Sequence, residues 1–141
     1  MKRDVFVDAS AWIALLKANE RVHPRALSYW RQLLEDRARL VTTSYVISES
    51  ATRLRYDAGL PAALAFRERL RWAVSRGLLR IAWIDETVDA EGWQILAQHA
   101  DVTLSLADAT SAAVARRAKI TEVFTFDGGF RSLGFDVQPV G

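Results

Sequence analysis

Four acidic residues spread along the chain are candidates for a metal site: Asp8, Glu49, Asp108 and Asp127. Four carboxylates within a few ångströms repel one another strongly, so such a cluster persists only with protons or cations as counter-charge. Oxygen ligands favour hard divalent ions, Mg²⁺ or Mn²⁺. A bound ion of this kind acidifies water and offsets charge on an attacked phosphate, which is the chemistry of phosphodiester hydrolysis.

The two acids nearest the N-terminus also have ordinary explanations. Asp8 follows the apolar run Val5–Val7, and aspartates at strand-to-helix junctions commonly cap the helix. Glu49 lies in a segment of mostly small or apolar residues, where it resembles an exposed helical glutamate paired with Arg53 four residues on. Taken singly, each of these ordinary interpretations is favoured.

The two later acids have similar alternatives. Ser105 and Asp108 have the spacing of a capping box, in which the acid satisfies the start of a helix. Asp127 precedes Gly128, and Asp-Gly pairs are typical of turns. The combination is stronger than any member, because each acid lies at a predicted strand end or at the start of a helix.

Short apolar runs alternate with segments of helical spacing along the chain. We predict strands at residues 5–7, 40–43, 78–84 and 123–126, with a short fifth at 135–137. We predict helices at 11–18, from 23 onward, 44–58, 61–76, 85–100 and 106–119. This alternation favours a three-layer α/β/α sandwich with a mostly parallel central sheet of four to five strands. The carboxyl ends of parallel strands share one edge, where the acids would meet.

Composition fits one globular domain over residues 1–141 and excludes several kinds of site. Half of the residues are hydrophobic and 26% are charged. There is no cysteine, which excludes disulfides, thiolate metal sites and cysteine nucleophiles. Only His23 and His99 are present, too few for a three-histidine zinc site. Neither a secretory leader nor a membrane-length apolar run is visible, so we expect a cytoplasmic protein without a membrane contact.

Charge is distributed unevenly between the two halves. Residues 1–80 contain 15 Lys+Arg and 8 Asp+Glu, whereas residues 81–141 contain 4 and 9. Most of the basic residues are arginines, whose planar guanidinium groups suit phosphate contacts, and a basic half attracts polyanions. On charge alone, solvated helix faces are the preferred interpretation.

Four segments in order resemble those of the PIN-domain ribonucleases, and within them the VapC-type toxins of bacterial toxin–antitoxin pairs. They are VFVDASAW from Val5, TTSYVISE from Thr42, LSLADA from Leu104 and VFTFD from Val123. Each is a weak motif alone, but all four in the right order are fairly specific. Chain length and element order also agree, so the resemblance covers nearly the whole chain.

The resemblance implies a Mg²⁺- or Mn²⁺-dependent endoribonuclease in which all four acids hold the metal, directly or through water. Asp8 and Asp108 are the expected direct ligands, and the other two acids would orient water or complete a second metal site. Ser10 matches a hydroxyl position often found beside the acids, where it would support them without touching the metal. Thr125 matches another.

The resemblance also implies partners: an RNA substrate, a cognate antitoxin protein and a second copy of the chain in a homodimer. A single-stranded or looped RNA is expected, since unstacked bases are the easiest to recognise. Candidate backbone contacts are Arg53, Arg55, Arg116 and Arg117. The five tryptophans (Trp12, Trp30, Trp72, Trp83 and Trp93) are expected mostly in the core, with some marking a dimer or inhibitor interface.

Three competing functions use the same acids. An aspartate-based phosphatase needs a second acid two residues after Asp8, where Ser10 stands. A phosphoacceptor signalling domain needs a lysine near a late strand, and the only late lysine, Lys119, precedes the fourth strand. A non-catalytic binding domain with an acidic pocket is the third, and the presence of all four acids makes it less favoured than a nuclease. The non-catalytic or phosphoacceptor domain remains the alternative to the nuclease.

Overall fold

The centre of the molecule is a sheet of five parallel strands in the order β3-β2-β1-β4-β5. A computed structural model describes residues 3–140. The strands are β1 Asp4–Val7, β2 Arg39–Thr43, β3 Leu79–Ala82, β4 Glu122–Phe124 and β5 Asp136–Gln138. β1 is central and its three apolar residues are fully buried, which explains its nearly uniform hydrophobic sequence.

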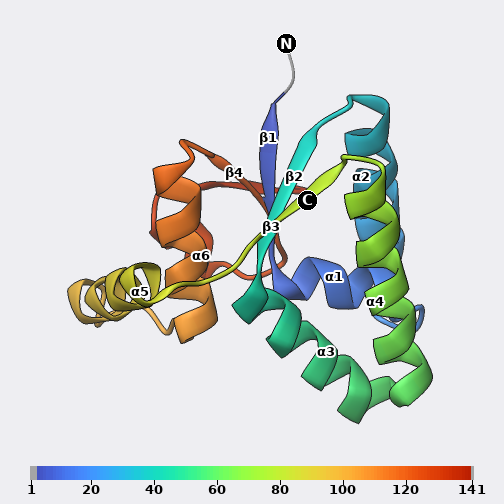
Figure 1. Ribbon diagram of the computed structural model, residues 1–141, viewed down its shortest axis with the longest axis horizontal. Helices are drawn as coiled ribbons and strands as arrows, with labels where there is room; N and C mark the ends of the chain where they lie inside the picture. The colour runs from blue at the N-terminus through green and yellow to red at the C-terminus, as the bar shows by residue number, and fades with distance from the viewer. Residues whose placement is uncertain (1–2, 141) are drawn as a thin grey trace.

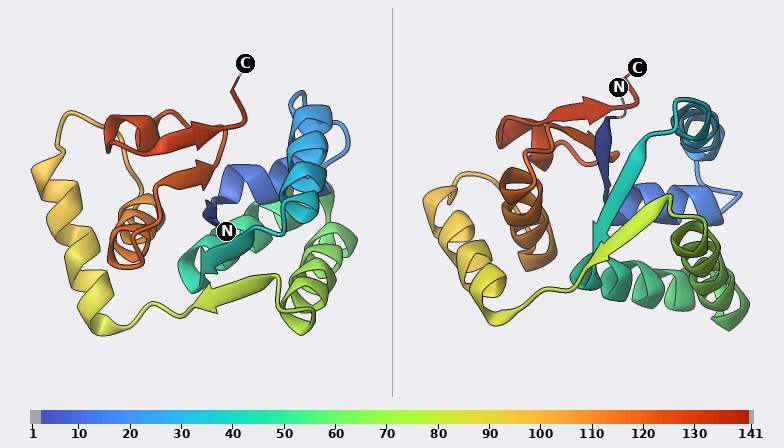
Figure 2. Two further views of the ribbon diagram at one scale, coloured as in Figure 1. Left: turned by 90° about the horizontal axis from the view of Figure 1, so that it is seen from above. Right: turned by 45° about the horizontal axis from the view of Figure 1, so that its top comes forward.

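Helices cover both faces of the sheet. They are α1 Ala9–Leu16, α2 His23–Glu35, α3 Ser44–Ala58, α4 Leu60–Ser75, α5 Glu86–Gln98, α6 Leu106–Arg117 and α7 Gly129–Ser132. Figure 1 shows α5 and α6 on one side of the sheet and α1, α2 and α4 on the other, with α3 leading away from its lower edge. The views in Figure 2 show the same separation. The predicted three-layer sandwich with a parallel sheet is confirmed.

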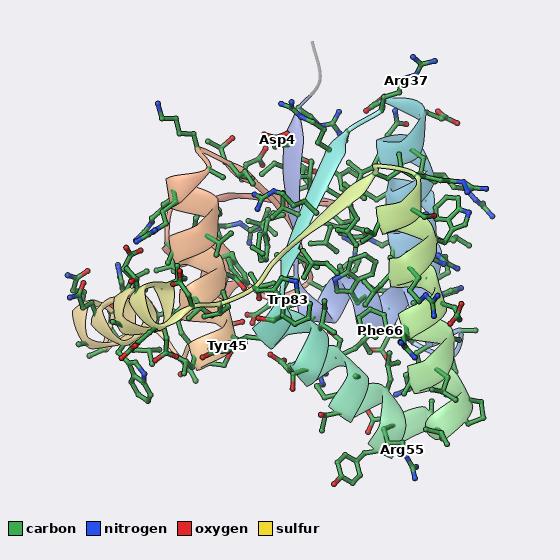
Figure 3. All side chains as sticks on the ribbon, viewed as in Figure 1. Asp4, Arg37, Tyr45, Arg55, Phe66 and Trp83 are labelled. Atoms are coloured by element: carbon green, nitrogen blue, oxygen red, sulfur yellow. The ribbon has the colours of Figure 1, made fainter. Side chains whose placement is uncertain are left out.

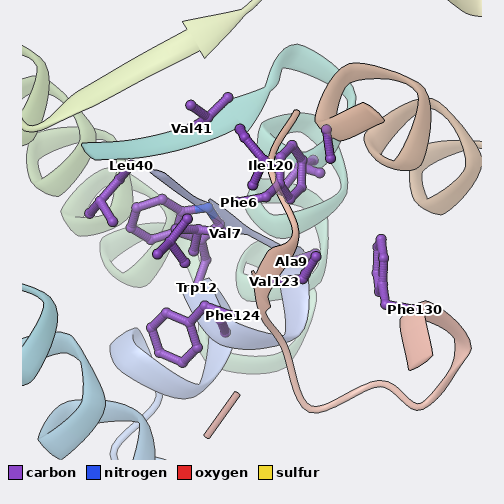
Figure 4. Packing of buried hydrophobic residues seen from close by; sticks show 14 of the residues in the cluster. Phe6, Val7, Ala9, Trp12, Leu40, Val41, Ile120, Val123, Phe124 and Phe130 are labelled. Atoms are coloured by element: carbon purple, nitrogen blue, oxygen red, sulfur yellow. The ribbon is translucent and has the colours of Figure 1, made fainter. Parts of the chain in front are cut away.

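The core beneath α1 is aromatic. The ring of Trp12 lies 5.8 Å from that of Trp30 and 5.6 Å from that of Phe66, measured between centroids. Its indole N–H donates to the hydroxyl of Thr42, which in turn donates to the carbonyl of Val7. Figure 4 shows Trp12 among the buried hydrophobic side chains of β1, β2 and β4. The polar atoms of the tryptophan and threonine are thus satisfied where they are buried, and α1 is fixed to the ends of β1 and β2.

The carboxyl edge of the sheet collects the segments that carry the acids. Asp8 continues the β1 ladder, since its N–H donates to the carbonyl of Phe124 at 3.0 Å. Thr125 continues β4 in the same way by donating to the carbonyl of Gln138. α3 begins directly after β2, and Thr43 caps its first turn through the N–H of Val46. The start of α6 lies at this edge too, because α6 runs back to deliver β4.

The sequence predicted every strand and helix except α7, with boundaries displaced by a few residues. The placement of the tryptophans was less accurate. Trp12 and Trp30 are buried as expected, but Trp72, Trp83 and Trp93 are exposed, Trp83 by 75%. Figure 3 labels Trp83 just beyond β3, near Tyr45 at the start of α3. Among the described residues, no helix combines the length and apolar character needed to cross a bilayer.

Gly92, a poor helix former inside α5, is explained by the contact between α5 and α6. A Cβ atom at this position would lie 2.5 Å from Cγ2 of Thr110 and 3.3 Å from its backbone N. Intrinsic propensity alone predicts that Gly92→Ala stabilises the helix by about 1 kcal/mol. We expect the clash to dominate, so that Gly92→Ala destabilises the protein by about 1–3 kcal/mol in urea unfolding.

A double mutant separates the two effects. Thr110→Ser removes Cγ2 but keeps the hydroxyl that donates to the carbonyl of Leu106. The pair Gly92→Ala with Thr110→Ser should therefore be more stable than the sum of the single changes. Stabilisation by Gly92→Ala alone would show that the helices do not approach this closely.

Candidate active site

Three carboxylates meet at the carboxyl edge of the sheet. Oxygens of Asp8, Asp108 and Asp127 all lie within 4.8 Å of one another. Asp8 ends β1, Asp108 lies in the first turn of α6, and Asp127 lies in the loop after β4. The fold therefore brings together three of the four predicted acids, which are separated by up to 119 positions in sequence.

Asp8 is buried, and two hydroxyl groups hold its side chain. Thr125 donates to its Oδ2 at 2.8 Å, and Ser10 donates to the same oxygen at 3.2 Å. The Ser10 and Thr125 hydroxyls are themselves 3.0 Å apart. Asp8 occupies the capping position of α1 but makes no side-chain capping bond. Its carboxylate is thus directed toward the other acids rather than used to start the helix.

Ser10 and Thr125 also fix the loop that carries Asp127. The backbone N–H of Phe126 donates to the Ser10 hydroxyl at 2.9 Å, and that of Asp127 donates to the Thr125 hydroxyl at 3.0 Å. Asp127 is exposed and accepts from the N–H of Gly129 at 3.0 Å. The turn suggested by its sequence is therefore present, and it coexists with the carboxylate cluster.

Asp108 forms the capping box that its sequence suggested and also lies in the carboxylate cluster. Its Oδ2 accepts from the N–H of Ser105 at 2.9 Å, and its own N–H donates to the Ser105 hydroxyl at 3.0 Å. This capping box uses one carboxylate oxygen. Within residues 3–140, the other oxygen, Oδ1, accepts no hydrogen bond, so it remains available to a cation.

Glu49 lies on α3 beside the cluster but outside the group of three. It forms the expected i,i+4 ion pair with Arg53, at 3.5 Å between Nη1 and Oε2. The pair is half exposed, and pairs of this kind contribute only a few tenths of a kcal/mol. Glu49 is nevertheless close enough to the acids for its charge to raise the pKa of Asp8.

Burial and mutual repulsion raise the pKa values of Asp8, Asp108 and Glu49. Burial, followed by the charge of Asp108, raises the pKa of Asp8 from its ordinary 3.8 to about 7, although the Thr125 hydrogen bond acts against this. Burial also raises the pKa of Asp108, and burial and then the charge of Asp108 raise that of Glu49. Removing these charges from water without compensation is unfavourable, so the site favours a bound cation.

The remaining candidate residues lie apart from the site. Arg116 and Arg117 end α6, about 12–13 Å along the helix axis from Asp108. Arg117 forms an ion pair with Glu91, and Arg116 lies over the ring of Phe135. Figure 3 shows Arg55 at the far end of α3 from Tyr45. These positions do not favour contact with a phosphate at the acids.

Two further arginines lie beside the acids and were not singled out in the sequence. Arg25 on α2 and Arg131 on α7 line a pocket that also contains Thr125 and Asp127. Arg131 follows Asp127 by four residues, so the short spacing in sequence could have predicted that the two residues lie close together. No sequence signal marks Arg25, since it lies 102 positions before Asp127, the acid whose pocket it lines.

Comparison with known proteins identifies relatives of the whole chain. Residues 5–136 match the family model of the PIN domain. The chain is 31% identical over 136 residues to a protein of Mycobacterium tuberculosis named 23S rRNA-specific endonuclease VapC20, in two strains. That alignment covers 96% of this chain and 98% of the relative.

Solved structures also match nearly the whole chain. A crystal structure of M. tuberculosis VapC20, described as a sarcin–ricin-loop-cleaving toxin, matches with a TM-score of 0.79 at 29% identity, covering 93% of this chain and 95% of that one. FitAcB from Neisseria gonorrhoeae matches with a TM-score of 0.67 at 23% identity, covering 96% of both chains. The second likeness supports the fold only.

Neutralising Asp8 should change how stability depends on pH in metal-free protein. With the pKa raised to about 7, the folded state keeps a proton that the unfolded state has lost, so stability falls as pH rises from about 4 to about 7. Asp8→Asn cannot ionise, so the part of this decline that Asp8 causes should disappear, while the raised pKa values of Asp108 and Glu49 leave a smaller decline. We expect the variant to exceed the wild type by about 2–4 kcal/mol at pH 8, and by much less at pH 4.

Urea unfolding with a chelator at both pH values measures this difference. Glu68→Gln removes a carboxylate on α4 that is 70% exposed, and should keep the wild-type pH dependence. Equal pH dependence of wild type and Asp8→Asn would mean that Asp8 is not buried among other acids.

Proposed function

Because this chain belongs to the PIN-domain family, within its VapC-type group, we propose that it is a metal-dependent endoribonuclease and the toxin of a type II toxin–antitoxin pair. The observation that carries the proposal is the convergence of Asp8, Asp108 and Asp127 at one edge of the sheet. The relative with 31% identity is named as a nuclease specific for 23S rRNA. Ribosomal RNA is accordingly the first substrate to test.

The residues present fit a hard divalent cation. The donors are carboxylate oxygens, and the chain has no cysteine. The oxygens of three carboxylates are close enough to share one ion, and the burial of Asp8 makes an uncompensated charge costly there. We propose that Asp8 and Asp108 hold Mg²⁺ or Mn²⁺. When bound, this ion supplies acidified water and offsets charge on the attacked phosphate.

The other residues have distinct proposed tasks. Thr125 and Ser10 fix the rotamer of Asp8 by donating hydrogen bonds to Oδ2, and so hold its carboxylate beside the other acids. The capping box holds Asp108 on the rigid start of α6. Glu49 and Asp127, which are more exposed, orient the attacking water or complete a second metal site.

The rival functions fit the geometry less well. The position two residues after Asp8 is occupied by Ser10, whose hydroxyl is engaged with Thr125, so the second acid of an aspartate-based phosphatase is missing. Lys119 lies before the start of β4, at the edge of the sheet opposite the acids. It therefore cannot accompany a phosphorylated Asp8 in a signalling domain.

Family membership also leads us to propose two protein partners, an inhibitory antitoxin and a second copy of the chain. The exposed tryptophans supply candidate contact surfaces, since Trp83 and Trp93 are 75% and 57% exposed. Large exposed aromatic side chains are enriched at the centres of protein interfaces.

Amide substitution of the clustered acids tests the enzymatic proposal. Purified protein should cleave ribosomal RNA with Mg²⁺ or Mn²⁺ and lose this activity with a chelator. Asp8→Asn and Asp108→Asn should each lower kcat/KM by about 100-fold or more, because each removes a charged ligand. Glu49→Gln should cost less, about 10-fold, because Glu49 lies outside the tight group.

The control is Glu68→Gln, whose cleavage should equal that of the wild type. Circular dichroism establishes that each variant is folded. Release of phosphate from small monoesters without RNA cleavage would favour a phosphatase, and uptake of phosphate from a small donor would favour a signalling domain. Absence of metal-dependent RNA cleavage would overturn the proposed function.

Thr125 should act through Asp8 rather than on the substrate. Thr125→Val keeps the shape but removes the donor to Asp8 and the acceptor for the N–H of Asp127. We expect the pKa of Asp8 to rise further and Mg²⁺ to bind about 10–100-fold more weakly by calorimetry. Thr125→Ser keeps the hydroxyl and should retain most of the affinity. Equal Mg²⁺ affinity and an unchanged Asp8 titration by NMR in Thr125→Val would exclude this positioning role.

A further inference from the structure

Two surface pockets adjoin each other beside the candidate active site. The first, of about 310 Å³, has Asp127 and Arg131 in its wall, and the second, of about 450 Å³, lies along α2. The two pockets share Arg25, Pro139 and Val140. They therefore adjoin at these residues, and together they extend from Asp127, past Arg25, along the side of α2. We call this the α2 track.

The first pocket of the α2 track has two arginines free to bind an anion. Among residues 3–140, no carboxylate lies within 4.0 Å of either Arg25 or Arg131. Arg25 is also held in position. Its Nη2 donates to the carbonyl of Pro139 at 3.3 Å, and its guanidinium lies 5.5 Å from the ring centroid of Phe126. A positioned guanidinium loses less entropy when it binds a phosphate than a freely rotating one does.

The second pocket suits a base, because Arg25 is the single charged side chain among the described residues that line it. It is lined by Pro24, Ser28, Tyr29 and Gln32, together with the three shared residues. Nε2 of Gln32 already donates to Asp36, which leaves its amide oxygen as an acceptor. Apolar walls with a few polar atoms suit an unstacked base.

Positive charge beside the acids is needed to offset their repulsion of the RNA backbone. RNA carries one negative charge for each nucleotide, and the acids repel every phosphate near them. A divalent ion at Asp8 and Asp108 offsets the charge only at the bond that is cut. The next phosphate along the strand still faces the exposed carboxylate of Asp127. Arg53, on the other side of the cluster, is engaged with Glu49.

We propose that the α2 track binds the RNA strand on one side of the cleaved bond. Arg131 and Arg25 hold the phosphate next to the scissile one, and the nucleotide beyond it places its base in the second pocket. This inference rests on the proposed function for its substrate class. It adds two binding residues and a direction for the strand, away from Asp127 and along α2.

Binding to short single-stranded oligoribonucleotides tests the α2 track independently of cleavage. The probe is a fluorescently labelled hexanucleotide, measured by anisotropy with Mg²⁺ in the full chain carrying Asp8→Asn to prevent hydrolysis. Adding Arg25→Gln or Arg131→Gln should weaken binding about 10-fold and reduce the salt dependence by about one phosphate contact. The matched control is Arg76→Gln, which lies where α4 leads into the amino end of β3 and should change neither quantity.

Steady-state cleavage provides the second measurement. In the otherwise wild-type chain, Arg25→Gln and Arg131→Gln should raise KM about 10-fold while kcat changes less than 3-fold. Unchanged KM and an unchanged salt slope in both variants, in a chain that cleaves RNA, would overturn the α2 track but leave the proposed function intact. Absence of oligonucleotide binding would also overturn it, as would an effect of both variants on a protein partner alone.

The two proposals fail separately. If the chain cleaves no RNA with Mg²⁺ or Mn²⁺ but binds the oligonucleotide through Arg25 and Arg131, the proposed catalysis is wrong; RNA binding by the track then stands, but its position beside a cleaved bond does not. Circular dichroism and thermal unfolding of the arginine variants check folding, and two separate positions guard against one local perturbation.

Discussion

The burial of one carboxylate organises the candidate site. Asp8 is 3% exposed, and it directly follows a strand whose apolar residues are completely buried. A charge in that place is unfavourable unless something compensates it. Hydrogen bonds donated by Thr125 and Ser10 partly stabilise the charged form of Asp8, whereas the nearby carboxylates of Asp108 and Asp127 destabilise it. The fold therefore holds the carboxylates close together although their repulsion is unfavourable. Binding of a divalent cation would remove this repulsion and so stabilise the folded protein.

A parallel sheet makes this concentration of charge possible. The backbone ladders that continue past β1 and β4 bring Asp8 and Thr125 side by side without any direct attraction between their side chains. The start of α6 adds Asp108, whose second oxygen is occupied by its capping box. Rigid backbone structure thus opposes the repulsion between the acids, which flexible loops would relieve by moving apart. Only Asp127 stands on a loop, and two hydroxyls bind that loop to the acid they also support.

The sequence was sufficient for what depends on local pattern, and insufficient for what depends on packing between distant segments. Apolar runs alternating with helical segments predicted all five strands, and four motifs in order predicted a cluster of acids, of which Asp8, Asp108 and Asp127 come together. That these acids hold a metal stays a prediction. That Glu49 lies outside the tight group depends on how α3 leaves the sheet edge, which periodicity does not encode. Trp83 and Trp12 have equally apolar side chains, yet one is exposed and the other buried. The approach of Arg25 to Asp127 depends on a contact over more than 100 residues, so neither composition nor spacing indicated it.

The two halves of the sequence, which carry unequal charge, contribute different charged residues to the site. The basic half contributes Arg25 through α2 and Arg53 through α3, and the acidic half contributes Asp108 and Asp127. Two of the carboxylates that would repel an RNA strand thus have a guanidinium nearby, since Glu49 pairs with Arg53 and Asp127 shares a pocket with Arg25. Arg53 is engaged by Glu49 while Arg25 rests on an aromatic ring and a carbonyl. A strand entering along α2 therefore meets a guanidinium that pairs with no carboxylate of residues 3–140, whereas one entering over α3 must first displace an ion pair. This difference gives the site a preferred direction of approach.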